Sequence, residues 1–312
     1  MTAGNPPRPR DMQLPGRREG RAADRWAGLV EGWLKGHTIL VYAFLYLPIV
    51  IVVVFAFNDT NRRVTAWDGF STKWFGVAFA DSVVQKALLN SFIVALPNAI
   101  LATTFGTMAA LGLQRVGRKL RTTFDALTYT SIIVPEIVIA LSTLVLFATA
   151  FGVIEAVTGF KPTFGHITII AAHMLFNTSL VLLLVRARLS GMDRTLVEAS
   201  SDLFATPWRT FRQITFPMLL PAIIAGFLLA FTFSFDDYVI TTFVSGPGSS
   251  TLPLFIFGQI KRGVTPETNA VATLILLFTL GMLLIGQMAL IWQSRRQGRK
   301  GGGDMASIIA ER

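Results

Sequence analysis

Long apolar runs without charge recur along the chain and are separated by shorter polar segments. Six of these runs are long enough to cross a bilayer: 38–57, 87–113, 126–153, 167–185, 213–235 and 270–292. A helix needs about 20 apolar residues to cross the roughly 30 Å hydrocarbon layer. Only the run 126–153 contains an ionisable Asp, Glu, Lys or Arg, namely Glu136. The pattern predicts an all-α polytopic membrane protein with six transmembrane helices.

Composition supports this fold class. Of 312 residues, 52% are hydrophobic and 15% are charged, against about 25% charged in an average soluble domain. This balance excludes a disordered chain, a coiled coil and an ordinary soluble enzyme. The chain has no cysteine and only three scattered histidines, so we expect no metal site and no cofactor.

The basic residues are distributed unevenly between the two sides of the predicted helices. Of the 28 Lys and Arg residues, 21 lie in the N-terminal tail, the 114–125 and 186–212 loops and the C-terminal tail, and 7 lie in the alternating loops. Cytosolic loops carry the excess of Lys and Arg in membrane proteins. Both termini are therefore expected in the cytosol. The net charge of +10 is attributed to these loops and not to nucleic-acid binding.

Four segments follow from this topology. Residues 1–36 form a cytosolic N-terminal tail, which is rich in Arg, Pro and Gly and expected to be disordered, with a short interfacial helix over Trp26–Lys35 as the alternative for that part. Residues 37–84 comprise the first membrane anchor helix and a periplasmic loop. Residues 85–293 hold the other five helices, and residues 294–312 form a flexible cytosolic C-terminal tail.

The cytosolic stretch between the fourth and fifth spans is unusually long, and part of it has helical periodicity. Asp193 can cap a helix start, apolar residues follow at spacings of three and four, and Thr206-Pro207 is typical of the start of a second helix. The resulting amphipathic helix can pack against the cytosolic ends of the spans. Alternatively, it can dock a soluble partner.

The same stretch resembles the EAA loop of permeases from binding-protein-dependent ABC importers. The family pattern is matched at Glu198, Ala199, Ile214 and Pro217. The chain departs from it with Ser200 for the second Ala, Phe204 for a Gly and Phe216 for a Leu. A Gly at the Phe204 position permits a tight turn that Phe disfavours. The resemblance implies an ATPase-coupling loop over 193–206 whose residues are Glu198, Ala199, Ser200, Asp202, Leu203, Phe204, Ile214 and Pro217.

Other segments are similar to the spermidine/putrescine branch of these permeases. They are Val134-Pro135-Glu136-Ile137, the run from Ser234 to Ile240, Ser245-Gly246-Pro247-Gly248, Thr251-Leu252-Pro253-Leu254 and Pro266-Glu267-Thr268-Asn269-Ala270. The resemblance covers about residues 85–293 and implies the type I ABC importer permease fold in a bacterial inner membrane. It also implies a second homologous permease subunit, a cytosolic ATPase dimer that hydrolyses ATP, and a periplasmic polyamine-binding protein.

Acidic residues in or beside the spans are the candidates for a substrate pathway. Glu136 lies about ten residues into its predicted span, or roughly 15 Å, near the bilayer midplane. Asp236 and Asp237 end the fifth span, where they and Tyr238 could attract ammonium groups at a wet outer mouth. The structural alternatives are a paired or protonated Glu136 and an acidic pair that only marks a helix end.

His173 and Asn177 lie four residues apart in the fourth span. They are expected to hydrogen-bond each other or a neighbouring helix, and lining the pathway is the alternative.

Three hypotheses on function remain. The first is the pore-forming subunit of a polyamine importer, and the second is a permease of the same family for another small solute. The third, a secondary transporter or channel working without ATPases, is disfavoured by the EAA-like loop. No P-loop, His-Glu-x-x-His or Gly-x-Ser-x-Gly motif occurs, so no enzyme is expected.

Overall fold

The computed structural model describes residues 17–60, 66–193 and 195–310. Within these ranges the regular structure is helical, apart from an isolated antiparallel bridge between Asn58 and Phe70. The chain forms two compact units, residues 1–54 and residues 55–312. The parts of the predicted tails in residues 1–16 and 311–312 lie outside the described residues.

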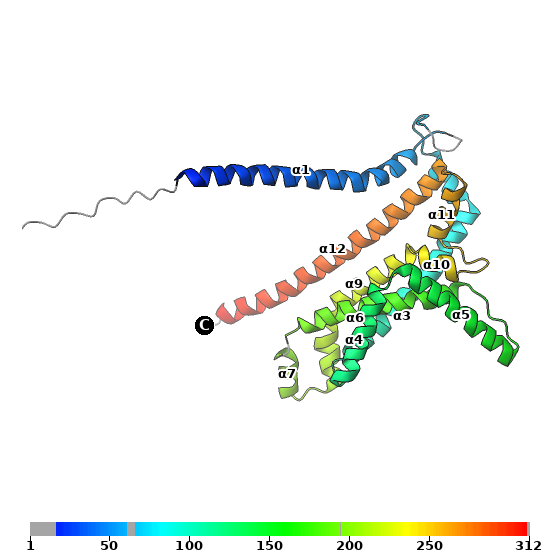
Figure 1. Cartoon of the computed structure of the whole chain (residues 1–312). Coiled ribbons are helices and arrows are strands. Elements are labelled where there is room, and N and C mark those ends of the chain that lie inside the picture. The colour runs from blue at the N-terminus through cyan, green and yellow to red at the C-terminus, as the bar shows by residue number, and fades with distance from the viewer. Residues whose placement is uncertain (1–16, 61–65, 194, 311–312) are drawn as a thin grey trace, which may run out of the picture. The chain divides into compact units, whose positions relative to one another are not determined.

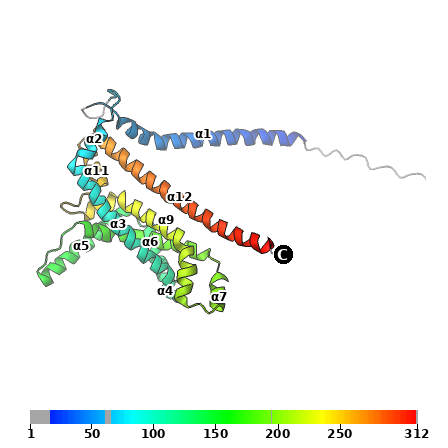
Figure 2. The same cartoon turned by 180° about the vertical axis from the view of Figure 1, so that it is seen from behind.

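Figures 1 and 2 show the helices from opposite sides. The helices are α1 Arg17–Phe55, α2 Lys73–Ala80, α3 Ser82–Gly112, α4 Arg118–Ile133, α5 Glu136–Thr158, α6 His166–Ser190, α7 Thr195–Asp202, α8 Pro207–Thr210, the π-helical turn η1 Phe211–Thr215, α9 Phe216–Phe235, α10 Val239–Val244, α11 Leu252–Arg262 and α12 Pro266–Ala310.

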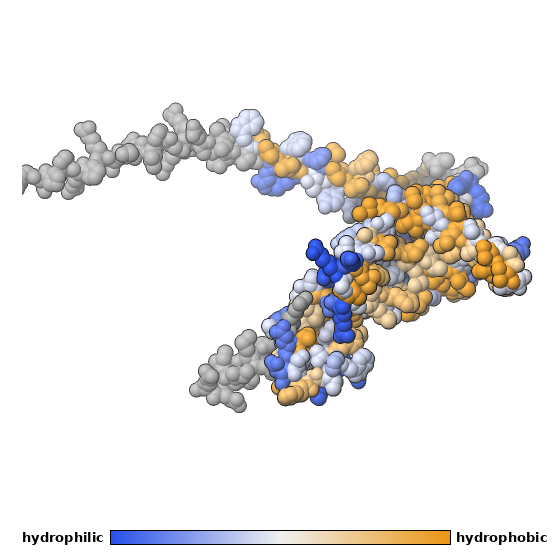
Figure 3. Space-filling model, turned by 60° about the horizontal axis from the view of Figure 1, so that its bottom comes forward, coloured by the Kyte–Doolittle hydropathy of each residue, from blue (hydrophilic) through white to orange (hydrophobic). Residues whose placement is uncertain are grey.

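Six of these helical segments are long and apolar enough to cross a membrane, which confirms the predicted number of spans. They are Gly28–Phe55, Ser82–Gly112, Glu136–Thr158, His166–Ser190, Pro207–Phe235 and Pro266–Met288. Their apolar side chains are widely exposed, and Figure 3 shows orange hydrophobic surface over much of the visible face. Such continuous apolar surface requires lipid or a partner protein to cover it.

Both predicted tails are more helical than expected. Helix α1 begins at Arg17, ahead of the segment Trp26–Lys35 for which the sequence offered a short helix. Its Glu31–Lys35 ion pair (2.6 Å) and Trp33–His37 ring stack (5.4 Å) join residues one turn apart. Helix α12 continues through the predicted tail to Ala310. No proline follows Pro266 in α12, so no missing N–H interrupts its backbone ladder.

Helices α3, α6 and α9 pack together as the centre of the second unit. Val181 of α6 lies between two glycines, Gly106 of α3 and Gly226 of α9. A Cβ atom added to Gly106 would lie 2.8 Å from the Cβ of Val181, and a Cβ atom added to Gly226 would lie 3.2 Å from the Cγ1 of Val181. Small residues allow this close approach of membrane helices. This packing fixes the three helices that position the site below.

The predicted third span, 126–153, is not one helix. Helix α4 ends at Ile133, Val134 and Pro135 are extended, and α5 begins at Glu136. Pro135 has no N–H for the helical ladder and disfavours the α conformation at Val134. The two helices run in different directions from this break (Figures 1 and 2). Glu136 is therefore the first residue of its span, and the predicted position ten residues inside it is wrong.

Candidate functional site

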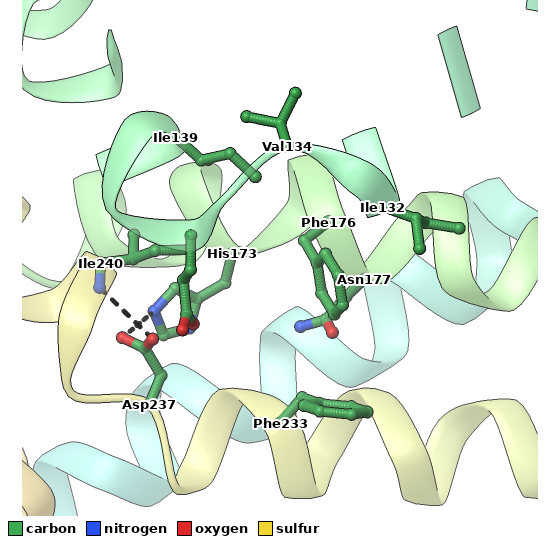
Figure 4. Close-up of a pocket in the computed structure, with 10 residues that line it drawn as sticks. Ile132, Val134, Ile139, His173, Phe176, Asn177, Phe233, Asp237 and Ile240 are labelled. Atoms are coloured by element: carbon green, nitrogen blue, oxygen red, sulfur yellow. Dashed lines mark hydrogen bonds and ion pairs between the residues drawn. The ribbon is translucent and has the colours of Figure 1, made fainter. Parts of the chain in front are cut away.

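A cavity of about 230 Å³ lies where the α4–α5 break meets α6, α9 and α10. Its lining residues are Ile132, Val134, Glu136, Ile139, His173, Phe176, Asn177, Phe233, Asp237 and Ile240. Figure 4 shows them converging from separate elements. The cavity brings together Glu136 and Asp237, two of the four predicted pathway residues.

Asp237 is held by several donors at the start of α10. Its Oδ2 accepts from Thr241 N (2.7 Å) and Thr241 Oγ1 (2.7 Å) and lies 3.0 Å from His173 Nε2, while its Oδ1 accepts from Ile240 N at 3.3 Å. Asp237 is 8% exposed and His173 is 2% exposed. The sequence placed Asp237 at a wet mouth, and that expectation is wrong because the turn after α9 directs it inward.

His173 connects this carboxylate to α9. Its Nδ1 lies 2.8 Å from Ser234 Oγ. Because an ionised carboxylate can only accept, Nε2 carries the hydrogen that points at Asp237. The three residue types are those of a hydrolase triad, but Ser234 is 3% exposed and does not line the cavity. A nucleophile needs access to its substrate, so the group is structural.

Asn177, one turn from His173, pairs with α3. Its Nδ2 donates to Asn98 Oδ1 (2.6 Å), and Asn98 Nδ2 donates to the Ile170 carbonyl (3.2 Å). His173 and Asn177 thus bond neighbouring helices and not each other, and both line the cavity. Asn177 Oδ1 accepts no hydrogen bond from any described residue.

Glu136 and Asp237 line the same cavity. Two ionised carboxyl groups in one small cavity repel each other, and a proton or a cation between them relieves this repulsion. The cavity wall beside them carries Phe176 and Phe233, whose rings meet edge to face with centroids 5.6 Å apart. Negative charge and aromatic rings together suit a cation with an apolar stem.

The other two predicted pathway residues lie outside the cavity lining. Asp236 ends α9 with an exposed side chain, so the adjacent carboxylates separate into one exposed and one buried group. The Tyr238 ring stacks on Phe257 with centroids 3.9 Å apart. One face of that ring is therefore already occupied by protein.

The 193–206 loop contains the predicted amphipathic helix as α7 and the second helix as α8. Thr195 N donates to Asp193 Oδ1 (2.9 Å), and this hydrogen bond lowers the pKa of that carboxyl. Thr206 caps α8, with Oγ1 3.4 Å from Arg209 N, and Pro207 is the first residue of α8. The predicted start signals of both helices are confirmed.

Phe204 occupies the backbone conformation that a glycine would favour. Its φ is +56°. Ala205 N donates to Ser200 O (3.0 Å) and Phe204 N to Ser201 O (2.9 Å), the paired bonds of a Schellman helix end. The chain thus forms the tight turn at the position where the EAA pattern has Gly, with a strained Phe in its place.

The apolar side chains of this loop point mainly outward. Leu203, Phe204 and Trp208 are 82%, 96% and 68% exposed. Glu198, Ala199 and Asp202 are also exposed, whereas Ser200 is buried and lies 2.9 Å from Thr210 Oγ1. Leu203 and Phe204 of the predicted apolar stripe are thus exposed and available to a partner, because they do not pack against the rest of the chain.

Ile214 and Pro217 flank the junction with α9. Pro217 has no N–H to donate back to Gln213, and at this point the chain makes the wider π turn, in which Phe216 N donates to Phe211 O. Through this turn α8 joins α9, so one continuous helical segment links the loop to Ser234 beside the cavity.

Sequence reasoning missed several residues of this site. Asn98, Ser234 and Thr241 hold the lining residues in place, and Phe176 is a wall residue. The only available signal was the presence of polar residues inside apolar spans, which marks Asn98 and Ser234 as needing partners.

Residues 102–298 match the family described as Binding-protein-dependent transport system inner membrane component. The putrescine transport system permease protein PotI of Escherichia coli K12 is 42% identical over 239 residues, covering 76% of this chain and 83% of PotI. The spermidine/putrescine permease PotC of the same strain is 34% identical over 266 residues, covering 85% of this chain and 96% of PotC.

A crystal structure of a bacterial ABC transporter involved in importing the polysaccharide alginate has the same fold, with a TM-score of 0.68 at 14% identity over 87% of this chain and 99% of that one. This chain belongs to the family of binding-protein-dependent transport system inner membrane components. It is an ABC importer permease of the inner membrane, and not an enzyme.

Proposed function

We propose that this chain is a pore-forming subunit of an ATP-driven polyamine importer, with both termini in the cytosol. The cavity that joins Glu136, Asp237 and two phenylalanine rings carries the proposal, because this chemistry favours ammonium groups on apolar chains. The similarity to PotI and PotC, which are named for putrescine and spermidine/putrescine transport, supports the same cargo.

A second homologous permease is the proposed cover of the cavity. Glu136 is exposed at the start of a spanning helix, next to the non-helical backbone of Val134 and Pro135. Neither a carboxylate nor irregular backbone is tolerated against lipid tails, but both are tolerated where protein or a water-filled cavity faces them. A partner permease packed on this face supplies that environment.

The other partners follow from opposite ends of the permease. The exposed Leu203, Phe204 and Trp208 suit a groove on a cytosolic ATPase dimer. A periplasmic polyamine-binding protein would deliver the cargo on the other side. The exposed Asp236 would add attraction for the cation near the cavity, whereas the packing of Tyr238 on Phe257 favours a structural role.

Uptake of labelled putrescine by the complete complex in lipid vesicles tests the pathway. Glu136→Gln keeps the size of the side chain but removes its charge, and a hydrogen bond to a charged group contributes about 1.5–3 kcal/mol. We expect uptake to fall at least about tenfold, while the ATPase subunits still copurify.

Glu155→Gln is the matched control. Glu155 lies on the same helix, 3.8 Å from Lys161 and outside the cavity lining. Uptake by the Glu155→Gln complex should therefore equal uptake by the wild-type complex. Equal uptake by both variants would remove Glu136 from the pathway. Preferential uptake of an uncharged solute would overturn the polyamine assignment.

A further inference from the structure

A small polar pocket lies at one end of the spanning helices α3 and α6, beside the first turns of α4. Its volume is about 120 Å³, and its lining residues are Ala110, Leu113, Gln114, Arg121, Arg186, Leu189 and Ser190. Both spans end close to it, α3 at Gly112 and α6 at Ser190. The pocket therefore lies at the level where these helices leave the apolar layer of the membrane.

The charges at this pocket leave a surplus of positive charge. Arg186 Nη1 donates to Asp125 Oδ1. This hydrogen bond holds the pKa of Asp125 below its ordinary value, and the charge of Arg121 acts in the same direction. Asp125 is thus ionised at neutral pH and neutralises one of the two guanidinium groups. The side chain of Arg121 is exposed and donates no hydrogen bond within the described part of the chain, so it is available to an anion.

An apolar groove continues from this pocket toward the membrane interior. Its volume is about 520 Å³, and its lining residues are Ala109, Phe124, Leu127, Thr128, Thr130, Ser131, Val134, Ile139, Ser142, Thr143, Leu146, Leu175, Thr178, Ser179 and Leu182. Leu182 lies one turn before Arg186 on α6, and Phe124 lies one turn after Arg121 on α4. The pocket and the groove thus lie between the same faces of these two helices, which pack against each other (Figure 1).

The groove has the surface and the length that a hydrocarbon chain requires. Several hydroxyl groups line it, but those of Thr128, Thr143 and Ser179 donate to carbonyl oxygens of their own helices. Along α6 the pocket and groove extend from Arg186 to Leu175, eleven residues or about 17 Å. This length is close to half of the roughly 30 Å hydrocarbon layer, which is the depth that one acyl chain fills.

The groove also meets the Glu136 cavity, because Val134 and Ile139 line both. The two spaces differ in charge. Among the described residues, no acidic side chain lines the groove, and Arg121 and Arg186 lie at its far end. Like charges repel, so a cation that the cavity attracts is disfavoured along this groove.

We infer that the pocket and the groove bind an anionic phospholipid, with its phosphate at Arg121 and Arg186 and one acyl chain in the groove. Guanidinium groups pair with phosphate through two parallel N–H donors. Basic pockets between spanning helices bind anionic lipid headgroups. The surplus positive charge favours phosphatidylglycerol, whose headgroup is negative, over zwitterionic phosphatidylcholine. This inference goes beyond the proposed function and does not depend on the cargo.

Native mass spectrometry of the complete complex tests the preference for an anionic lipid. The complex is stripped of lipid in detergent and titrated with phosphatidylglycerol or with phosphatidylcholine of equal chain length. We expect phosphatidylglycerol to bind at least about fivefold more tightly, since basic side chains near a membrane surface attract anionic lipids. Equal affinity for the two lipids overturns the inference, as does the absence of bound lipid because the partner permease covers the groove. Full displacement of the lipid by inorganic phosphate also overturns it, since the pocket is then a site for a small anion.

Two pairs of variants locate the lipid. Arg121→Gln should remove most of the preference for phosphatidylglycerol, whereas Arg118→Gln, at an exposed position of the same helix outside the pocket lining, should keep it. Ser142→Phe narrows the groove and should weaken the binding of both lipids at least about fivefold, whereas Val145→Phe, exposed on the same helix outside the groove lining, should not. If Arg121→Gln keeps the preference seen in Arg118→Gln, the headgroup site is wrong. If Ser142→Phe binds lipid as tightly as Val145→Phe, the acyl-chain site is wrong.

Discussion

In the cavity, His173 and Asp237 are polar groups at 2% and 8% exposure, whereas in the 193–206 loop Leu203 and Phe204 are apolar groups at 82% and 96% exposure. Hydrogen bonds among four helices, α3, α6, α9 and α10, hold the buried polar groups of the cavity, and the Glu136 side chain is left exposed beside them. The loop instead keeps its apolar surface unburied. Each region therefore offers its proposed partner a suitable group. The cavity offers a carboxylate to a small cation, and the loop offers apolar side chains to a groove on a protein.

The largest effect on uptake should come from a bulky side chain on the exposed face of α7. Ala199 is exposed on α7, and Ala199→Trp adds a ring where a partner must approach closely. Overfilling a packed contact destabilises it by up to about 3 kcal/mol, so we expect uptake to fall roughly a hundredfold. Membrane insertion should be normal, and ATP hydrolysis should no longer respond to the loaded binding protein.

Ala156→Trp serves as the control, because it places the same ring on an exposed position of α5. A complex carrying Ala199→Trp that crosslinks to the ATPase and transports like wild type would contradict the assigned role of the loop.

A smaller effect, on stability, should separate the two adjacent aspartates. Asp237→Asn removes the charge that His173 and Thr241 contact, which should destabilise the fold by about 2 kcal/mol. Asp236→Asn, at an exposed position, should change stability by less than about 0.5 kcal/mol. Thermal unfolding of the purified complex measures both. Equal changes in unfolding temperature for the two variants would mean that the buried Asp237 carboxylate contributes no more to stability than the exposed Asp236 carboxylate.

The smallest effect should be a gain in stability. Phe204→Gly relieves the left-handed conformation of a residue with a Cβ, which is unfavourable by about 1–2 kcal/mol, so the unfolding temperature should rise slightly. Loss of the exposed ring should at the same time weaken ATPase binding. Phe204→Ala is the control, since it removes the ring but keeps the strain. If both variants bind the ATPase normally, the ring has no role in docking.

Hydropathy was sufficient to predict the six spans because each is a long apolar run. It did not reveal the α4–α5 break, since Val134 and Pro135 are themselves apolar and do not lower the average of the run. In the N-terminal tail the sequence indicated a short helix only over Trp26–Lys35, which contains Glu31 and Lys35, whereas the observed helix begins at Arg17. The helical continuation into the C-terminal tail was not predicted, because composition reports polarity and not helical spacing.

The site was predicted in its residue types more than in its arrangement. Glu136 and Asp237 were singled out as intramembrane or interfacial charges, but the sequence cannot tell which of two adjacent aspartates points inward. That choice depends on where α9 ends and α10 begins. The pairing of His173 with Asp237 joins residues 64 positions apart, and no local pattern encodes it. The EAA resemblance located Phe204, and only the backbone revealed its left-handed turn.

The helical segment that runs from Pro207 through η1 to Phe235 has a mechanical consequence. Its α9 part alone contains 20 residues and so measures about 30 Å. A helix of this length is stiff along its axis, so a displacement applied at its first residue, Phe216, is carried to Ser234. The wider turn at 211–215 separates α9 from Trp208, and a π turn is a point at which a helix bends. A movement of the loop therefore reaches the cavity as a tilt of α9 about this turn.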